Sequence, residues 1–511
     1  MKDKLEQLAL GLSANNVGAA FGVSGSGPSF KLISHLLDNG VPYYPLSHEA
    51  SAAIAAGAYT FLSGKTGVAI TIKGPGFANM VPGLAANYME RYGAICLSED
   101  YDDAVSTKKM HKRLNQFSVV SAVTGGMASL LHLDELTTFL AAEPGNEMPK
   151  YFAISNTQLP AGLPEVEEHD AEVADTYLDI VLDKIAHAER PVLIVGSLIK
   201  RLGIDISHLN LPVFTTAQAK GTLDEAAANA CGIYTGVGKA LVAETCILKA
   251  SDCVVTIGVR NFEILGTDVK NQSINFDIIH PCFTDNDTAV NIDQIKKIIT
   301  VLAAPINWAA DKITENRKEL AAYTNSYQWM PGNAFDVINK LEYDHTMVLD
   351  TGTFCTIGEH VWACKAGRNF IGSSNGRNLG LSIPTTIGAC MALPGQPVFC
   401  AVGDGGIRYY AADIRTIAER QLPVCILFMS DGRYGSIISN LANFKTNDTI
   451  TTPMGNSWVN VVAAMGIASQ QVTSTEGFKT QIDAWDKKTP LFLQCEFDPE
   501  TYLSVTLDLR G

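Results

Sequence analysis

Two aspartates occupy positions where a parallel sheet would bring their carboxylates together. Asp404 lies in the turn Gly403-Asp404-Gly405-Gly406 after the apolar stretch FCAV, and Asp431 follows 27 residues later, after LPVCILFM and Ser430. A β-α-β unit places the carboxyl ends of its two strands side by side, so both carboxylates can meet one metal ion. Glycines let the backbone approach a phosphate, and Mg²⁺ prefers oxygen ligands. The pattern predicts a magnesium site beside a phosphate, although a bare Gly-Asp-Gly is more often an ordinary turn.

Glu49 is a second residue that could do chemistry. It precedes the Ala-rich segment ASAAIAAGAYTFL (50–62), the apolar segment GVAITI (67–72) and the turn Gly74-Pro75-Gly76. As an exposed carboxylate in the first turn of a helix, it would simply suit the helix dipole. A carboxylate is in general also able to act as an acid or a base.

Short apolar strands alternate with amphipathic helices along the chain, which is typical of α/β folds with parallel sheets. The acidic, proline-containing segment GLPEVEEHDAEV (162–173) is expected to be a linker, and the more charged residues 304–335 a second connector. We therefore predict three doubly wound parallel-sheet domains, over residues 1–165, 186–305 and 335–511. Expected strands include 17–23, 190–197, 253–259, 396–405, 422–432 and 490–497.

Composition limits the classes of function. Hydrophobic residues make up 47% of the 511 residues and the formal net charge is −15, which argues against extensive disorder and against a nucleic-acid partner. Eleven cysteines without a Cys-x-x-Cys pair suggest neither a disulfide framework nor a zinc ribbon. No apolar run approaches the roughly 18 residues that span a bilayer, and MKDKLEQLALGL resembles a helix more than a signal peptide. We expect a cytoplasmic protein without a membrane partner.

The segment from Gly403 to Tyr434 resembles the metal–diphosphate motif of thiamine diphosphate (ThDP) enzymes, which opens with Gly-Asp-Gly and ends in paired asparagines after a strand. The resemblance implies that Asp404, the Asp431 side chain and the Arg433 backbone carbonyl hold Mg²⁺. It also implies that the cofactor contacts Gly405, Gly406, Tyr434 and Gly435. Here Ser430-Asp431 replaces the asparagine pair, and we expect the site to survive with one more negative charge.

Three other segments extend the resemblance. Glu49 before its Ala-rich helix is similar to the family's first domain, which implies that Glu49 hydrogen-bonds N1′ of the aminopyrimidine and activates the cofactor. In the segment Asn375–Pro384, Leu379 is implied to hold the two cofactor rings in a bent conformation. The turn Asp350–Cys355 resembles one that contacts the cofactor through Gly352 and Thr353. Cys355 either lines the substrate site or is an inert buried cysteine.

The middle of the chain is similar to the central domain of the acetolactate synthase and pyruvate oxidase branch. The similar segments are RPVLIVGS (190–197), TTAQAKGTLDE (215–225) and ASDCVVTIGVR (250–260). Some members bind FAD or ADP in this domain. Because no clear Gly-x-Gly-x-x-Gly fingerprint is present, we expect a structural central domain without FAD.

Cationic residues could select the substrate. Lys73 precedes the Gly74-Pro75-Gly76 turn, and His111, Lys112 and Arg113 form a short cationic run. Lys73, His111 and Lys112 could bind a carboxylate, sulfonate or phosphonate. A solvated cationic cluster is the alternative for Lys112 and Arg113.

The resemblance spans nearly the whole chain, in the order pyrimidine-binding, central and diphosphate-binding domain. It implies a ThDP- and Mg²⁺-dependent enzyme that decarboxylates a small 2-oxo acid and then ligates the product, as acetolactate synthase does. The alternatives are a non-ligating decarboxylase, a C–C lyase or a ThDP-binding protein with little catalysis. The family architecture further implies a homodimer or homotetramer in which Glu49 of one subunit meets the diphosphate domain of another.

Overall fold

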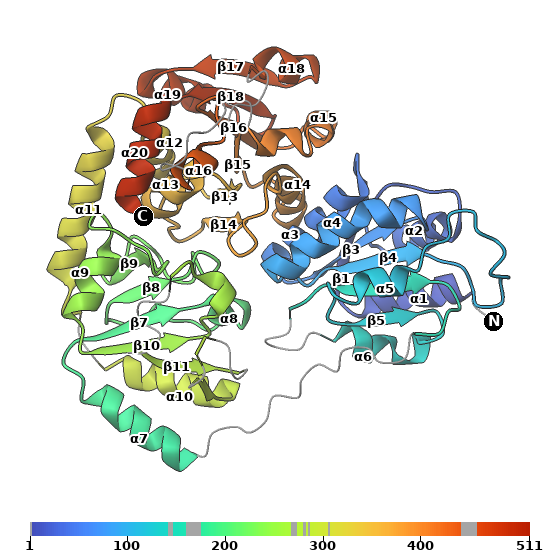
Figure 1. The fold of residues 1–511 in the computed structure, drawn as a ribbon, viewed down its shortest axis with the longest axis horizontal. Helices are drawn as coiled ribbons and strands as arrows, with labels where there is room; N and C mark the ends of the chain where they lie inside the picture. The colour runs from blue at the N-terminus through green and yellow to red at the C-terminus, as the bar shows by residue number, and fades with distance from the viewer. Residues whose placement is uncertain are drawn as a thin grey trace.

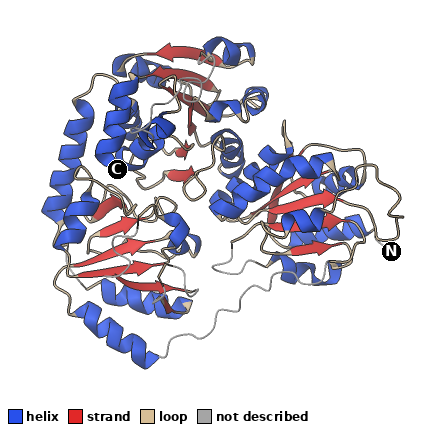
Figure 2. Ribbon diagram, viewed as in Figure 1, coloured by secondary structure: helices blue, strands red, loops and turns tan. Residues whose placement is uncertain are grey.

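The computed structural model describes residues 3–141, 147–159, 175–266, 273–278, 283–284, 287–304, 307–440 and 457–510. Within these ranges the chain forms three six-stranded sheets, and every pair of neighbouring strands is parallel. Helices cover both faces of the sheets (Figure 2). The predicted α/β class with three doubly wound domains is therefore confirmed.

The first sheet has the strand order β2-β1-β3-β4-β6-β5. Its strands are β1 (Val17–Gly22), β2 (Tyr43–Pro45), β3 (Thr66–Thr71), β4 (Ile95–Glu99), β5 (Met127–Ser129) and β6 (Lys150–Ile154). Its helices are α1 (Lys4–Ala14), α2 (Pro28–Asp38), α3 (Glu49–Ser63), α4 (Pro75–Glu90), α5 (Gln116–Val120) and α6 (Leu136–Leu140).

The second sheet has the order β12-β11-β10-β7-β8-β9. Its strands are β7 (Pro191–Val195), β8 (Val213–Thr215), β9 (Ala230–Ile233), β10 (Cys253–Ile257), β11 (Ser273–Asp277) and β12 (Thr288–Ala289). The accompanying helices are α7 (Asp175–Ala186), α8 (Ser197–Arg201), α9 (Ala243–Ala250) and α10 (Ile292–Leu302). The helix α11 (Ala310–Asn325) then runs along the outside of the molecule towards the third sheet (Figure 1).

The third sheet, β14-β13-β15-β16-β18-β17, repeats the strand order of the first. Its strands are β13 (Thr346–Leu349), β14 (Asn369–Gly372), β15 (Val398–Gly403), β16 (Val424–Ser430), β17 (Ala468–Val472) and β18 (Leu491–Glu496). Its helices are α12 (Pro331–Asn339), α13 (Thr353–Val361), α14 (Ser382–Ala392), α15 (Ala412–Glu419), α16 (Gly435–Asn440), α18 (Val459–Ala464), α19 (Thr475–Ala484) and α20 (Pro499–Leu509).

The first and third domains share one apolar core through the helices α3 and α14, which pack against each other (Figure 1). Residues Ala50 to Tyr59 of α3 are all buried, because small side chains allow the helix to be covered on several sides. The contact is close at Gly388, where an added Cβ would lie 2.3 Å from the Ala55 carbonyl oxygen.

The three sheets lie within residues 17–154, 191–289 and 346–496. The predicted linker at 162–173 falls outside the described residues, so the domain boundaries stay predictions. No helix in the described ranges has both the length and the apolar character needed to cross a bilayer.

Candidate active site

Two carboxylates meet at the carboxyl ends of the neighbouring parallel strands β15 and β16. The Ser430 hydroxyl donates to Asp404 Oδ1 at 2.8 Å, and the Asp431 backbone N–H donates to Asp404 Oδ2 at 3.2 Å. The Arg433 N–H donates to Asp431 Oδ1 at 3.0 Å. The structure thus brings together the two aspartates that the sequence predicted as metal ligands.

Both carboxylates resist ionisation. Burial raises the pKa of Asp404 to about 6; the Ser430 hydrogen bond opposes this rise, and the charge of Asp431 adds to it. Burial also raises the pKa of Asp431, against the hydrogen bond from Arg433. A divalent cation would stabilise such a crowded pair in its ionised form.

The protein supplies only part of a metal coordination shell here. Among the described residues, no group of three or more His, Cys, Asp or Glu side chains is placed to hold a metal ion. A cation between Asp404 and Asp431 would therefore need further oxygen ligands from the backbone, from water or from a bound phosphate. That composition is typical of Mg²⁺ sites, which use one or two carboxylates together with substrate phosphates.

A cavity of about 260 Å³ opens beside this pair. It lies at the carboxyl ends of β13, β15 and β16, where the strand order reverses, and ligands of open α/β sheets bind at such points. Its lining includes every metal and cofactor residue predicted in the third domain: Gly352, Thr353, Leu379, Asp404, Gly405, Gly406, Asp431, Arg433, Tyr434 and Gly435.

Two glycines of the turn are needed for steric reasons. A Cβ added to Gly406 would lie 2.3 Å from Asp350 Oδ2, and one added to Gly405 would lie 3.0 Å from Leu379 and 3.1 Å from Tyr434. Side chains at these positions would displace the loops that form the cavity wall. The turn therefore presents bare backbone to the cavity, as a phosphate-binding loop requires.

Asp350 is a site-supporting residue that the sequence analysis did not single out. It is fully buried and accepts hydrogen bonds from the Gly380 N–H at 2.9 Å, the Thr351 N–H at 2.8 Å and the Ser382 hydroxyl at 3.2 Å. These bonds fix the loop that carries Leu379 to the end of β13. Its position directly after a buried strand, as for Asp404, was the signal that could have revealed it.

Glu49 is the first residue of α3. The Asn79 side-chain amide donates to Glu49 Oε2 at 3.1 Å, and His48 Nδ1 caps the helix by accepting from the Ala50 N–H at 3.1 Å. Glu49 is not among the residues that line the cavity. In the described part of the chain, Glu49 therefore lies outside the cavity that Leu379 and the two aspartates line.

The cationic residues predicted for the substrate lie in the first domain, outside the cavity lining. Lys73 Nζ pairs with the buried carboxylate of Glu99 at 3.1 Å. His111 and Lys112 are exposed in a loop, and the Lys112 carbonyl oxygen would lie 2.6 Å from a Cβ added to Gly74. The loop therefore packs over the Gly74-Pro75-Gly76 turn, beside Lys73.

Cys355 is buried against a charged pair and does not line the cavity. Its Sγ donates to Glu359 Oε1 at 3.4 Å and accepts from Arg377 Nη1 at 3.3 Å, and burial raises its pKa far above the usual range. Arg377, and Tyr502 from α20, are among the lining residues that were not predicted as site residues. Arg377 lies two residues before the predicted Leu379, whereas Tyr502 belongs to no recognisable motif and reaches the cavity through tertiary packing.

Family models match all three parts of the chain. The model "Thiamine pyrophosphate enzyme, N-terminal TPP binding domain" matches residues 4–119, the central domain of the same enzymes matches residues 178–303, and their C-terminal TPP binding domain matches residues 350–495. Together these matches cover well over half of the chain, in the order of the three sheets. The chain belongs to the thiamine pyrophosphate enzyme family.

Similar curated proteins cover nearly the full length of this thiamine pyrophosphate enzyme. A probable acetolactate synthase large subunit from Methanococcus aeolicus is 24% identical over 98% of the chain and 93% of its own length. The acetolactate synthase isozyme 2 large subunit of Escherichia coli is 22% identical, over 92% and 91%. A probable 2-ketoarginine decarboxylase from Pseudomonas aeruginosa is 24% identical, over 91% and 89%. The relatives are thus carboligases and a decarboxylase.

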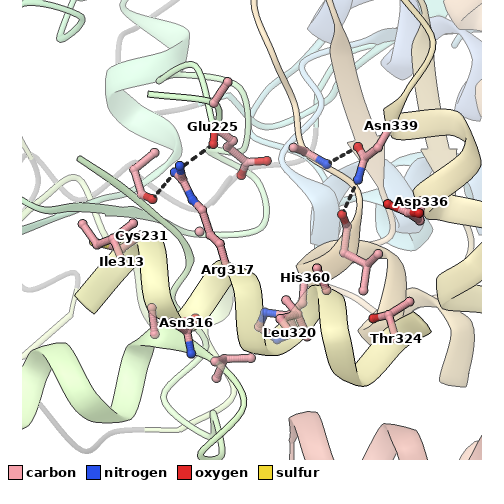
Figure 3. Close-up of a pocket in the computed structure, with 18 of the residues that line it drawn as sticks. Glu225, Cys231, Ile313, Asn316, Arg317, Leu320, Thr324, Asp336, Asn339 and His360 are labelled. Carbon is pink, nitrogen blue, oxygen red and sulfur yellow. Dashed lines mark hydrogen bonds between the residues drawn. The ribbon is translucent and has the colours of Figure 1, made fainter. Parts of the chain in front are cut away.

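A second cavity, of about 310 Å³, lies elsewhere in this enzyme (Figure 3). It is formed by the central domain, by α11 and by the helices α12 and α13, and Arg317 of α11 donates there to the carbonyl oxygens of Glu225, Ala227 and Ala230. None of the predicted site residues lines it. The predicted cofactor residues therefore gather at the other cavity, although its volume of about 260 Å³ is smaller.

Proposed function

We propose that this enzyme uses Mg²⁺ with its thiamine cofactor to decarboxylate a small 2-oxo acid and to join the remaining fragment to a second carbonyl compound. The observation that carries the proposal is the convergence of the predicted metal and diphosphate residues on one cavity. Similarity to acetolactate synthases over nearly the full chain supports the carboligation step.

Six of the residues that line the cavity have a defined task in this proposal. Asp404, Asp431 and the Arg433 carbonyl would hold Mg²⁺ together with the diphosphate, while Gly405 and Gly406 leave room for it. Leu379 would pack between the two rings of the cofactor. When bound, the cofactor supplies a carbon nucleophile and an electron sink for decarboxylation.

We further propose that Glu49 of a partner subunit completes the site, so that the functional unit is a homodimer or a homotetramer. The proposal is supported by the position of Glu49 outside the cavity lining of its own chain. There the carboxylate would share a proton with N1′ of the aminopyrimidine, a role that needs a group able to exchange a proton.

A non-ligating decarboxylase is the second candidate, favoured by the relative named as a 2-ketoarginine decarboxylase, whose identity equals that of the first acetolactate synthase. Measuring CO₂ and ligated product together from a panel of 2-oxo acids separates the two functions. Equal amounts of substrate consumed and aldehyde formed would identify a simple decarboxylase.

We expect no flavin in the central domain. The buried carboxylate of Glu263 accepts from the Ser197 N–H at 2.9 Å and from the Thr216 hydroxyl at 2.7 Å. The Glu263 carboxylate therefore already accepts from the first N–H group of α8, the helix that follows β7. In a dinucleotide-binding domain, the N–H groups at this position would bind a phosphate instead. Flavin released from the denatured protein in amounts equal to the chain would contradict this.

The decisive test of catalysis is Glu49→Gln, with Glu419→Gln on the protein surface as a matched control. We expect turnover to fall at least about 100-fold, as for loss of a general acid–base group, while ThDP stays bound. Unchanged turnover would contradict a catalytic role of Glu49, and no turnover by the wild type would leave a ThDP-binding protein with little catalysis.

A further inference from the structure

Among the described residues that line the cofactor cavity, two carry a positive charge, Arg377 and Arg433. Arg433 belongs to the metal end, where its charge acts on the pKa of Asp431 and its Nη1 pairs with Glu500 Oε1 at 2.8 Å. Arg377 lies two residues before Leu379 and interacts instead with Glu359 and Cys355. The cavity thus has a second cationic position on the Leu379 side.

The Glu359 carboxylate binds the two terminal nitrogens of the Arg377 guanidinium. Nη1 donates to Glu359 Oε1 at 3.1 Å and to Cys355 Sγ at 3.3 Å, and Nη2 donates to Glu359 Oε2 at 3.5 Å. Within the described ranges, Nε–H and the second hydrogen of Nη2 have no partner. These two groups lie on one edge of the guanidinium, in the geometry that binds a carboxylate or phosphonate through two parallel hydrogen bonds.

Glu359 does not fully neutralise the positive charge of Arg377, because the same carboxylate also pairs with Arg510. Its Oε2 also accepts from Arg510 Nη2 at 2.5 Å, so one buried carboxylate serves two guanidinium groups. His360 accepts from Arg510 Nε at 2.9 Å, and burial lowers its pKa well below the usual range, so it adds no charge.

Glu90 is the other anion close enough to act on the Arg377 charge. Its carboxylate is occupied by the Ser373 hydroxyl and by the N–H groups of Ser374, Asn375 and Gly376 at 3.0–3.1 Å. It therefore influences Arg377 through its field, without using the free edge of the guanidinium.

The backbone holds Arg377 in a conformation that is unfavourable for its residue type. Its φ is +49°, in the left-handed region where residues other than glycine are uncommon and where strain concentrates at functional positions. The loop is fixed on one side by the bonds to Glu90 and on the other by the Gly380 N–H, which donates to Asp350 Oδ1 at 2.9 Å. The arginine is thus preorganised at the cavity wall.

We infer that Arg377 recognises a second anionic group on the substrate, so that the preferred 2-oxo acid carries a carboxylate, phosphonate or sulfonate at its far end. This inference rests on the proposed function, because it names the substrate class of the same site. Binding requires only that the free Nε/Nη2 edge of Arg377 meet the far anion while the 2-oxo group lies near the reactive part of the cofactor. A neutral or cationic tail would leave that edge unpaired in a desolvated cavity.

The test compares acids that differ only at the far end, on the holoenzyme with ThDP and Mg²⁺. One pair is 2-oxoglutarate and its neutral amide 2-oxoglutaramate, and the other set is phosphonopyruvate and sulfopyruvate against pyruvate. We expect kcat/KM for CO₂ release to favour the acid with the second anion by about 10-fold or more, as for one charge-assisted hydrogen-bonded pair. The member of the panel with the highest kcat/KM identifies the type of anion.

The variants Arg377→Gln and Arg377→Lys assign that preference to the side chain. Gln leaves Glu359 paired with Arg510, so no buried carboxylate is stranded. We expect R377Q to lose about 10- to 100-fold in kcat/KM for the dianionic acids and less than about 3-fold for their neutral-tail partners. R377K should be intermediate, because it keeps the charge without the two-bond geometry. Arg415→Gln on the surface of the same domain is the control.

Two measurements separate a failure of this inference from a failure of the proposed function. The dissociation constant of ThDP should be unchanged in R377Q; a parallel loss of cofactor and of all substrates would make Arg377 a cofactor-site residue and overturn the inference. If the wild type consumes neutral-tail acids as well as dianionic ones, the proposed function stands and the inference fails.

If no 2-oxo acid is consumed, the proposed function fails, and calorimetry with the unreactive pair glutarate and its monoamide then decides about Arg377. Binding of glutarate by the wild type, weakened at least about 10-fold in R377Q, supports the anion site. Equal binding by both proteins overturns it.

Discussion

Asp350 and Asp404 show how one residue type takes two tasks at neighbouring strand ends. Both follow buried strands, and burial raises the pKa of both, to about 7 for Asp350 and about 6 for Asp404. The oxygens of Asp350 accept from Gly380, Thr351 and Ser382 away from the cavity lining. Asp404 also accepts hydrogen bonds, from Ser430 and Asp431, but it lines the cavity. The first residue fixes a loop, and the second is available to a metal ion.

Asp350 makes the stability of the cofactor-free protein depend on pH. Its folded-state pKa of about 7 lies above the ordinary value of 3.8, so folding takes up a proton between these pH values. The contribution of Asp350 therefore favours the folded state at low pH and is lost as the pH rises towards 7. Between pH 5 and pH 8 it amounts to about 2–3 kcal/mol.

The variant Asp350→Asn removes this titration while keeping an oxygen that accepts from Gly380. We expect the wild type to lose about 2–3 kcal/mol more than D350N between pH 5 and pH 8, in urea unfolding free energies. Comparing the two proteins cancels the titration of all other groups. Identical pH profiles would show that Asp350 has an ordinary pKa.

Ser430 is predicted to set the pH range in which the metal binds. Its hydroxyl donates to Asp404 Oδ1 and lowers the pKa of that carboxyl, so Ser430→Ala should raise this pKa further. Protons then compete with Mg²⁺ at higher pH. We expect the Mg²⁺ dissociation constant of S430A, measured with ThDP by calorimetry, to rise about 10-fold near pH 6.

The defect in S430A should shrink at pH 8, where Asp404 is ionised in both proteins. A defect of the same size at both pH values would instead mean that the hydroxyl shapes the site without affecting the proton. Chelation of Mg²⁺ by EDTA should release ThDP from both proteins.

At the scale of elements, apolar runs located several central strands well but gave no indication of the edge strand β17. The predicted strands 17–23, 396–405 and 422–432 contain β1, β15 and β16, because parallel strands buried on both faces are nearly continuous apolar runs. The edge strand β17, with the sequence ASQQV, is largely exposed. A strand of this kind gives no such signal and is not predictable from the sequence pattern.

The cavity also contains residues that the sequence could predict and residues that it could not. Residues in strand-end turns, such as Asp404 and Gly405, follow from local sequence and from the family resemblance. Tyr502 reaches the cavity through the packing of α20. Its place depends on contacts between segments distant in the chain, which periodicity and motif spacing do not report.

The contact between α3 and α14 is expected to depend on Gly388. An added Cβ would lie 2.3 Å from the Ala55 carbonyl oxygen and 2.9 Å from the Ala58 Cβ, so Gly388→Ala must push the helices apart. We expect a loss of about 1–3 kcal/mol in unfolding free energy, the usual effect of overpacking. Gly126→Ala is the control, because its nearest neighbour would be 3.6 Å away; equal stability of the two variants would contradict the close contact.

At the scale of the whole molecule, the first and third domains have the same strand order but carry different predicted site residues. The third domain provides the cavity and the two carboxylates, while the first carries Glu49 outside the lining of that cavity. The family resemblance predicted both parts. Whether they meet within one chain or between two depends on the assembly of folded subunits, which no local pattern in the sequence encodes.

Subunit mixing tests the assembly directly. The variants Glu49→Gln and Asp404→Asn should each be nearly inactive alone, since one lacks the proton-exchanging carboxylate and the other a metal ligand. If a site combines Glu49 of one subunit with Asp404 of its partner, a mixed dimer contains one site with both residues intact and one with both replaced. Random exchange makes about half of the dimers mixed, so activity should return to about 25% of the wild-type value.

If both residues served one site within a single chain, every site would keep one defect and mixing would restore nothing. Purifying the mixed dimer through two different affinity tags should raise the recovery to about 50%, because each such dimer then has one intact site of two.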